Sequence, residues 1–490
     1  MRGKGSQSRC GVRDGWRPAL CTIAFTLALL PAALASGRVV LTVGTNGTYP
    51  TVQTALGGVT NGAVNEIRIQ SGTYVESVVI YVTLDSGELH VSGGWDQTFS
   101  TQTANPALTV IDGNGVGRCM FVELTGASSA MSVSFSNLTF TGGAADYGGG
   151  VYLATYGNVH YEISRCRITG STAIALNPKA GGLLVQLANG GRLELHDSTI
   201  DLNLAQSNGS GGYADGGGAY IALSGTSVVY LQRVVFSNNQ AEADTEIRGA
   251  GLSLWALDDA ATLVADSRFV DNEAVFSSFP VYPAVSGTGA VLTTFDSAWV
   301  EMRRNTLSGN SSQAGYGDQL ELFARNASQL GVWNTEVEGG YEGGVLARAY
   351  DTAALALANL TVVDNFSRGL LLELVHPTAF ATVINSILYG SFTDLVLYPG
   401  SGTIPTSNNL VGIDPLFVDR FGGDYRLAAG SPAENAGTSS QPPGVGYADC
   451  LGGVRVLDGA VDIGAHEGVN VLFSNAFESG TSDLWTQVVP

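Results

Sequence analysis

Two adjacent carboxylates in the segment WALDDAAT form the clearest grouping in this sequence that could do chemistry. Asp258 and Asp259 stand together, and Asp266 and Arg268 follow after one short apolar run. Pairs of carboxylates act as acid and base in glycoside hydrolysis, and carboxylate oxygens are the ligands that calcium prefers. All four residues are therefore candidate catalytic residues, and Asp258 and Asp259 are also candidate metal ligands. The alternative interpretation is a turn, with Asp266 and Arg268 in structural ion pairs.

Lysine and histidine offer few alternative bases or metal ligands. The only lysines are Lys4 and Lys179, so an arginine such as Arg268 or Arg303 would have to accept a proton. A neighbouring carboxylate favours the charged arginine and opposes that role. The histidines are isolated and lack metal-ligand spacing. They are His90, His160, His196, His376 and His466.

Any such site must be positioned by a repeated element. An apolar residue followed by Asn, Asp or Gly recurs roughly every 25 to 38 residues, as expected for a stacked-repeat protein. The runs are short, rich in β-branched and aromatic residues, and often alternate, which is typical of strands. A second apolar run led by Gly precedes most copies, so each repeat carries at least two strands. The repeated apolar positions are Phe140, Ile168, Ile200, Phe236, Phe269 and Leu307, with weaker copies at Val337, Val362 and Ile387.

A parallel β-helix accounts for this pattern. Each repeat forms one coil, and the apolar residue points inward onto its equivalents above and below. The chain then turns sharply, and Asn and Gly tolerate the left-handed backbone of such turns. Asn side chains on successive coils can also form a hydrogen-bond ladder. We therefore interpret the recurrent asparagines as turn-formers rather than catalytic residues: Asn238, Asn239, Asn272, Asn310 and Asn365.

The beginning of the repeat region, VVLTVGTNGTYPTVQTALGG, resembles the opening of pectin-lyase-like proteins. This resemblance implies an all-β fold, a right-handed single-stranded parallel β-helix of roughly ten coils. It also implies that the amphipathic stretch at 52–59 is a short helix that caps the open end, where unpaired backbone groups would invite aggregation. The fold hosts polysaccharide lyases and hydrolases, but it does not establish an activity. Of the NTD, DD, GHG and RIK segments typical of polygalacturonases, only DD occurs here.

The segment 408–468 resembles the choice-of-anchor Q domain of bacterial surface β-helix proteins. The likeness lies in DPLFVDRFGGDYRLAAGSPAENAGT and in ADCLGGVRVLDGAVDIGAHE, where His466 stands in place of the family's usual Tyr. It implies a surface setting rather than a reaction, and we expect the segment to close the C-terminal end of the β-helix. Asp414 and Asp462 are candidate calcium ligands, with turn-capping hydrogen bonds as the alternative.

The two ends of the chain indicate export. Residues 1–35 have a basic start, an apolar stretch and a small-residue cleavage site, as in a secretory signal peptide. The β-helix is then expected over 36–407. The tail 469–490, with its FESG segment, resembles a short sorting motif of exported proteins of Gram-negative bacteria. No later apolar run is long enough to span a membrane.

Composition restricts the partners. A net charge of −20 argues against nucleic acid binding. The expected role is therefore a secreted or surface-exposed bacterial protein with a non-enzymatic adhesive or structural function and a carbohydrate or cell-surface ligand. The alternative is a carbohydrate-active enzyme, a polysaccharide lyase or glycoside hydrolase, acting on an extracellular polysaccharide. No cofactor is expected beyond calcium.

The aromatic residues of the longest inserts have two possible roles. They either stack on sugar rings or fold back over the coil: Tyr213, Phe276, Phe279 and Tyr282.

Overall fold

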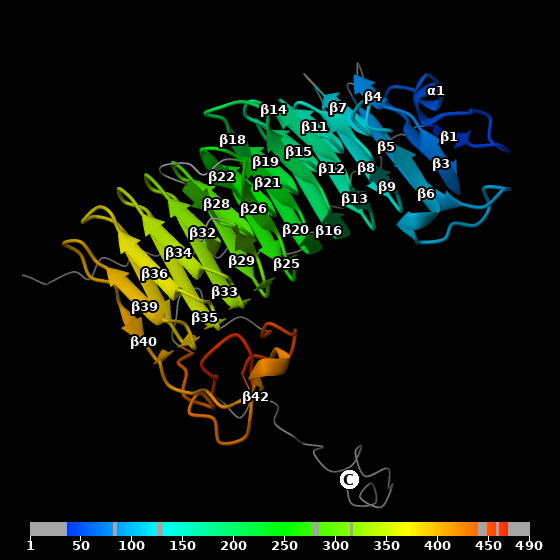
Figure 1. Ribbon diagram of the computed structural model, residues 1–490. Helices are drawn as coiled ribbons and strands as arrows, with labels where there is room; N and C mark the ends of the chain where they lie inside the picture. The colour runs from blue at the N-terminus through cyan, green and yellow to red at the C-terminus, as the bar shows by residue number, and fades with distance from the viewer. Residues whose placement is uncertain are drawn as a thin grey trace, which may run out of the picture.

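The chain winds into stacked coils whose strands form three long sheets (Figure 1). Sheet A has 21 strands, sheet B has 11 and sheet C has 6, and the strand pairs within them are parallel. The architecture is the right-handed parallel β-helix that the repeat predicts. In the described part of the chain, no helix is long and apolar enough to cross a membrane. The computed structural model describes residues 37–81, 86–124, 131–277, 284–313, 317–439, 448–456 and 460–468, so the expected leader (1–35) and tail (469–490) lie outside it.

One coil illustrates the path of the chain. β15 (Leu183–Leu187) lies in sheet B, β16 (Arg192–Asp201) in sheet A and β17 (Leu204–Ser207) in sheet C. β16 bends at Asp197, which has a left-handed φ of 52°. This bend divides sheet A into two faces. The strands of sheet B are β4 (Val78–Tyr81), β7 (Met120–Leu124), β11 (Val151–Thr155), β15, β19 (Ala219–Leu223), β23 (Leu252–Ala256), β28 (Ala290–Thr294), β32 (Asp318–Ala324), β34 (Gly343–Ala349), β36 (Arg368–Leu374) and β39 (Thr393–Tyr398).

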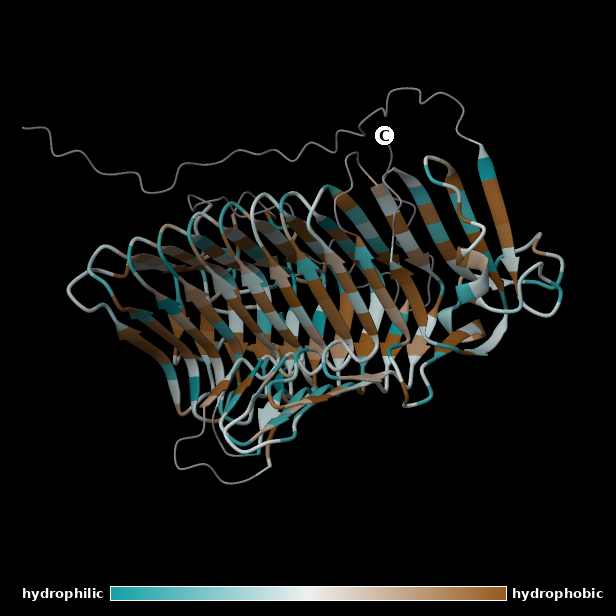
Figure 2. Ribbon diagram, turned by 90° about the horizontal axis from the view of Figure 1, so that it is seen from above, coloured by the Kyte–Doolittle hydropathy of each residue, from teal (hydrophilic) through white to brown (hydrophobic). Residues whose placement is uncertain are grey.

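The inward apolar column is confirmed from Phe140 to Val362. Its members pair in register from coil to coil, and none is more than 1% exposed. Figure 2 shows the apolar bands repeating along the coils. The prediction was wrong by one residue at the last copy, because Leu388 rather than Ile387 pairs with Val362. Alternation along a strand then turns Ile387 outward, where residues of the C-terminal segment cover it.

A ladder of buried asparagines closes the turn from sheet A to sheet C, as predicted. From Asn239 onward, each Oδ1 accepts hydrogen bonds from the backbone N–H and the Nδ2 of the asparagine one coil earlier, at 2.8–3.2 Å. Asn238, just before the ladder, has the left-handed φ of 52° expected for a turn. The ladder members in this run are Asn203, Asn239, Asn272 and Asn310.

Gln319 continues the ladder across a coil that has no asparagine at the ladder position. This coil carries Gly340 at the ladder position. The Gln319 side chain enters from β32, where its Oε1 accepts from Asn310 N (3.2 Å) and Nδ2 (2.9 Å). Its Nε2 donates to Asn365 Oδ1 at 2.9 Å. A Cβ at Gly340 would lie 2.7 Å from Gln319 Cγ, so the glycine makes room for this side chain.

A short helix caps the N-terminal end, as predicted. α1 (Val52–Leu56) buries Val52 and Ala55 completely against the first coils. Glu76, from a neighbouring coil, accepts hydrogen bonds from Val52 N (2.9 Å) and Gln53 N (3.0 Å). These bonds satisfy two donors that a helix start leaves unpaired.

The C-terminal segment, residues 408–468, packs against the outer face of sheet A (Figure 1). His466 Nε2 lies 2.5 Å from Glu336 Oε2 of β33 (Gln329–Glu338). Ala465 N donates to Thr361 Oγ1 of β35 (Ala354–Val363) at 2.9 Å. We expected this segment to close the end of the β-helix. Its first residues extend the last coil, where β41 (Leu410–Val411) pairs with β38 (Ile387–Tyr389), and its other contacts are with the side of the last coils. Its small apolar core joins Val363, Ile387 and Leu410 to Tyr425, Leu427, Ala433 and Ile463.

Arg455 holds the C-terminal segment together from within. The residue is 0% exposed, and burial lowers the pKa of its guanidinium. It donates to the backbone oxygens of Asp462 (2.9 Å) and Gly464 (2.7 Å) and lies 3.5 Å from the Glu467 carboxylate. A buried charge of this kind is tolerated because it is paired and hydrogen-bonded.

Candidate functional site

The carboxylates nominated by the sequence lie in turns and ion pairs. Asp258 has a left-handed φ of 59° and accepts a hydrogen bond from Gly225 N at 2.8 Å. Asp259, beside it, accepts from a serine hydroxyl. Asp266 is bound on both oxygens by Arg304, at 2.6 and 2.8 Å. The strand β24 (Ala261–Ala265) separates these turns. Arg268 is exposed at the start of the next strand.

The nominated metal ligands of the C-terminal segment also cap turns. Asp414 Oδ1 accepts from Leu416 N at 2.9 Å. Asp462 is buried, and its Oδ1 accepts from Asn435 N at 2.6 Å. Among the residues that the structure describes, no three His, Cys, Asp or Glu side chains form a group that could hold a metal ion.

Three histidines pair with glutamates on the outer face of sheet A. Their positions in the sequence did not reveal this pairing. His196 Nε2 lies 3.2 Å from Glu162 Oε1, and His160 Nε2 lies 3.4 Å from Glu194 Oε1. His90 pairs with a glutamate and a serine in the same way. The His160 and His196 pairs join neighbouring coils, whereas His90 pairs with Glu88 of its own strand.

A column of chemically mixed side chains lies where each coil enters sheet B. Tyr147, Lys179, Asp215, Arg248 and Ser286 occupy equivalent positions and pair in register from coil to coil. We name this set the edge column. In a parallel sheet, such equivalents lie roughly 4.8 Å apart. Three successive coils therefore present a lysine, an aspartate and an arginine side by side.

Asp215 is the centre of this edge column. It is 2% exposed, and its Oδ1 accepts from Ser253 Oγ at 2.8 Å. Its Oδ2 lies 3.6 Å from Arg248 Nη1. Burial raises the pKa of Asp215 despite the nearby positive charges of Arg248 and Lys179. Lys179 itself donates to Tyr220 OH at 3.2 Å and lies 4.5 Å from the centroid of that ring.

Aromatic rings line the outer side of sheet B beneath these cations. The Arg118 guanidinium lies 5.6 Å from the ring centroids of both Phe121 and Tyr152, and these two rings are 4.9 Å apart. Arg248 lies 5.5 Å from the Trp255 ring. Such cation–ring contacts are attractive. We name the set the cation–aromatic face: Arg118, Phe121, Tyr152, Lys179, Tyr220, Arg248 and Trp255.

Arg118 and Lys179 differ from most cations of the chain. Arg118 donates to the backbone oxygen of Tyr147, and Lys179 donates to a phenol. Among the described residues, neither has a carboxylate oxygen within 4.0 Å. The chain has 43 Asp and Glu against 23 Lys and Arg. Two cations without a carboxylate partner are therefore available to an anion from outside.

An acid cluster lies farther along sheet B. Asp318 is fully buried, and Arg368 Nε donates to it at 3.0 Å. Glu321 is 3% exposed, and burial next to Asp318 raises its pKa to about 8. Burial also raises the pKa of Glu342, to about 7. We name Asp318, Glu321, Glu342 and Arg368 the acid cluster; it holds carboxyl groups that stay protonated near neutral pH.

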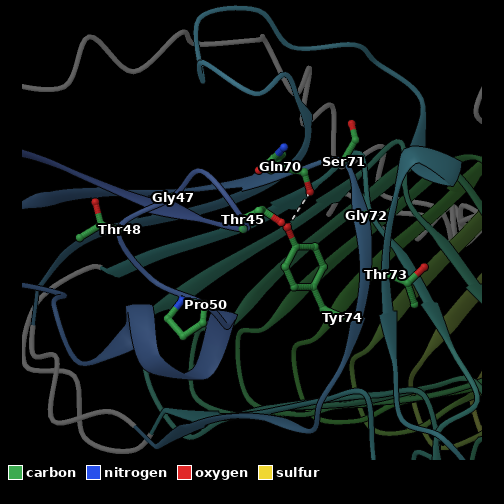
Figure 3. A pocket seen from close by; sticks show the side chains of 10 residues that line it. Thr45, Gly47, Thr48, Pro50, Gln70, Ser71, Gly72, Thr73 and Tyr74 are labelled. Atoms are coloured by element: carbon green, nitrogen blue, oxygen red, sulfur yellow. Dashed lines mark hydrogen bonds between the residues drawn. The ribbon is translucent and has the colours of Figure 1, made fainter.

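A pocket of about 510 Å³ lies at the N-terminal end of the β-helix (Figure 3). It lies between the loop 44–50 and the bend 70–74. Its side chains carry hydroxyl and amide groups, and Tyr74 forms one wall. The Tyr74 hydroxyl donates to the backbone oxygen of Gln70 at 2.8 Å.

The edge column left a signal in the sequence that strand patterns alone do not use. Each member stands directly before a small-residue triplet that opens a strand of sheet B or the run leading to it. The tetrapeptides are YGGG, KAGG, DGGG, RGAG and SGTG. Aligning the repeats on these triplets, rather than on the Asn turns, brings Lys179, Asp215 and Arg248 into one column.

The aromatic residues of the longest inserts fold back over the coil where the structure describes them. Tyr213 lies under Arg248 (5.5 Å), and Phe276 packs on a small apolar cluster. Phe279 and Tyr282 lie outside the described residues.

Comparison with known proteins gives likenesses of fold. No family model matches the chain, and no curated protein matches it. The solved pectate lyase Pel9A matches at 14% identity and a TM-score of 0.46, over 89% of this chain and 98% of that one. A pectin methylesterase from Aspergillus niger matches at 13% identity and a TM-score of 0.28, over 72% and 85%. A mannuronic acid specific family 6 polysaccharide lyase from human gut microbiota matches at 11% identity and a TM-score of 0.26, over 74% and 82%.

Proposed function

We propose that the chain is an exported bacterial surface protein that binds an acidic polysaccharide along the cation–aromatic face, in an adhesive or structural role. The observation that carries the proposal is the pair Arg118 and Lys179. Both cations lie over aromatic rings without a carboxylate partner among the described residues. A uronate carboxylate would supply the missing anion in a charge-assisted hydrogen bond, while the rings offer flat apolar surfaces to the faces of sugar rings.

The arrangement of the face suits a linear polymer. Its members come from successive coils, so equivalent groups repeat along the axis of the β-helix. Beneath the cations, Leu184 and Tyr220 are buried, and the partly buried rings of Tyr152 and Trp255 pack against them.

A surface location is part of the proposal. The leader expected over 1–35 supports export, and the resemblance of 408–468 to the choice-of-anchor Q domain supports retention at a bacterial surface. The tail 469–490, with its likeness to a sorting motif, supports the same setting.

A carbohydrate-active enzyme is the second candidate, because the acid cluster brings three carboxyl groups together beside Arg368. Glycoside hydrolysis needs one carboxyl that is protonated near neutral pH and another that is ionised. Glu321 and Glu342 have raised pKa values, and burial also raises the pKa of Asp318, which Arg368 binds. Against this candidate, the four catalytic residues nominated by the sequence lie in turns, in an ion pair or on an exposed strand.

The binding proposal is tested by calorimetric titration of the purified chain with polygalacturonate, alginate and neutral dextran. We expect both polyuronates to bind and dextran not to bind. The double variant Arg118→Gln/Lys179→Gln should weaken polyuronate binding by about tenfold or more, as expected for the loss of charge-assisted contacts. Arg268→Gln is the matched control, since Arg268 is an exposed cation outside the face.

Binding that is equal in the double variant and in the control would overturn the proposal, as would the absence of binding to either polyuronate. The same mixtures separate the two candidate functions. Release of reducing ends that disappears in Glu342→Gln would establish a hydrolase at the acid cluster. Ultraviolet absorbance from unsaturated products that disappears in Lys179→Gln would establish a lyase at the edge column.

A further inference from the structure

The N-terminal pocket is separate from both sites on sheet B. Its two walls are the loop 44–50, which follows the first strand, and the bend 70–74 of the next coil. Its volume of about 510 Å³ lies within the range of roughly 300–1,000 Å³ that small-molecule sites occupy. Figure 3 shows the Tyr74 ring reaching across from the bend towards the loop.

The walls of the pocket are fixed by the backbone. Tyr49 N donates to Thr42 O (2.9 Å), and Gly44 N donates to Tyr49 O (3.0 Å), which closes the loop on itself. Gln70 Oε1 accepts from Asn46 N at 3.2 Å and links the loop to the bend. A Cβ at Gly44 would lie 2.8 Å from the Tyr74 hydroxyl, so only glycine lets the ring stand where it does. A pocket held in this way does not have to be ordered by its ligand.

The lining is polar but carries no charge. Its hydroxyl groups come from Thr45, Thr48, Ser71 and Thr73. Burial raises the pKa of Tyr74 to about 12, which keeps the phenol neutral. None of the lining side chains is an acid or a base other than this phenol, so the pocket offers no charged side chain to an ion. Hydroxyl donors and acceptors beside an aromatic ring match the chemistry of an uncharged sugar.

We propose that this pocket is a second carbohydrate site, which takes an uncharged saccharide unit. The hydroxyls of Thr45 and Thr73, which have no hydrogen-bond partner among the described residues, would bind sugar hydroxyls. The Tyr74 ring would contact the apolar face of the sugar. This site is independent of the proposed function, because it shares no residue with the cation–aromatic face and selects against the charge that the face attracts.

Saturation-transfer NMR on the full chain tests the proposal, with cellotetraose, mannotetraose and galactotetraose as neutral probes and tetragalacturonate as the charged probe. We expect signal transfer to at least one neutral probe. The double variant Thr45→Val/Thr73→Val keeps the shape of the pocket and removes its two free hydroxyls. It should reduce that transfer at least fivefold, while Thr403→Val, at an exposed threonine near the other end of the molecule, should leave it unchanged.

The outcomes separate the two proposals. Transfer to no neutral probe, or equal transfer in the double variant and the control, overturns the pocket proposal whatever tetragalacturonate does. Loss of tetragalacturonate binding in Arg118→Gln/Lys179→Gln with neutral binding intact supports two sites. Loss of neutral binding in Arg118→Gln/Lys179→Gln places the neutral sugar on the cation–aromatic face instead and also overturns the pocket proposal.

Discussion

Gln319 takes the place of an asparagine that is missing from the ladder. Both ends of its amide are used, with Asn310 on one side and Asn365 on the other. All three residues are fully buried, so water cannot replace a lost partner. Leaving a buried polar group unpaired costs roughly 1–3 kcal/mol. The stability of the ladder therefore depends on a residue that belongs to a different sheet.

We expect Gln319→Ala to lower the free energy of unfolding by about 2 kcal/mol or more, since it removes the acceptor of two Asn310 donors and one of the two donors to Asn365 Oδ1. Urea unfolding followed by circular dichroism measures this change. Gln313→Ala is the control, because Gln313 is an exposed glutamine whose amide bonds only to Glu273 at 3.3 Å; its cost should stay within about 0.5 kcal/mol. Equal costs for the two variants would contradict the ladder as described.

Glu321 makes a pH dependence measurable at the level of one residue. Its pKa is about 8 in the folded chain, against an ordinary value of 4.5. The neutral carboxyl is therefore favoured by folding. Its contribution is fully present below pH 4.5 and is lost as the pH rises towards 8, because the unfolded chain ionises first.

We expect Glu321→Gln, a neutral isostere, to remove this loss. Between pH 5 and pH 8.5, the wild-type chain should lose at least about 1 kcal/mol of stability relative to the variant. Urea unfolding at the two pH values provides the comparison. Glu434→Gln, at an exposed glutamate, serves as control and should follow the wild type. A parallel pH profile for Glu321→Gln and wild type would show that Glu321 ionises normally.

At the scale of elements, the C-terminal segment is a unit with its own small core and its own docking face. It presses on β33 and β35 through His466 and Ala465, and Arg455 ties its loops together from inside. Apart from β41, which pairs with β38, its contacts lie on the side of sheet A, so the strand pairing of the earlier coils does not depend on it. The segment should therefore come loose before the β-helix unfolds.

Arg455→Ala tests this order of events. The variant removes the donor that holds the backbone of 462 and 464, so we expect limited proteolysis to cut within 408–468 first and to leave the β-helix intact. The rate of this first cut should rise about tenfold or more over the wild type, as expected when a buried hydrogen-bonded charge is lost. Arg426→Ala, which breaks an exposed pair with Asp424 in the same segment, should cut at the wild-type rate. Simultaneous cleavage of helix and segment would argue against an independent unit.

At the scale of the molecule, the features that recur in every coil were predictable from the sequence. Residues such as Phe236 and Asn272 identify their coils in the sequence, because the inward residue and the turn lie close together in the chain. The edge column was missed because its members lie in connections of unequal length, and only the triplets that follow them keep register. Gln319 could not be foreseen, since it enters the ladder from another sheet. The slip from Leu388 to Ile387 reflects a last coil whose outward face is also apolar, so alternation no longer distinguishes the two sides.

The ladder and the strand pairing join each coil only to the coils on either side of it. Duplication of a gene fragment that encodes one coil would therefore lengthen the protein without disturbing the helical cap at one end or the segment docked near the other. Each added coil would bring one more position in the edge column, whose side chain would meet those of the coils above and below, as Asp215 meets Arg248. Evolution could thus have lengthened the outer surface of such a chain by one coil at a time. Relatives that differ in length by whole coils would be the evidence for this history.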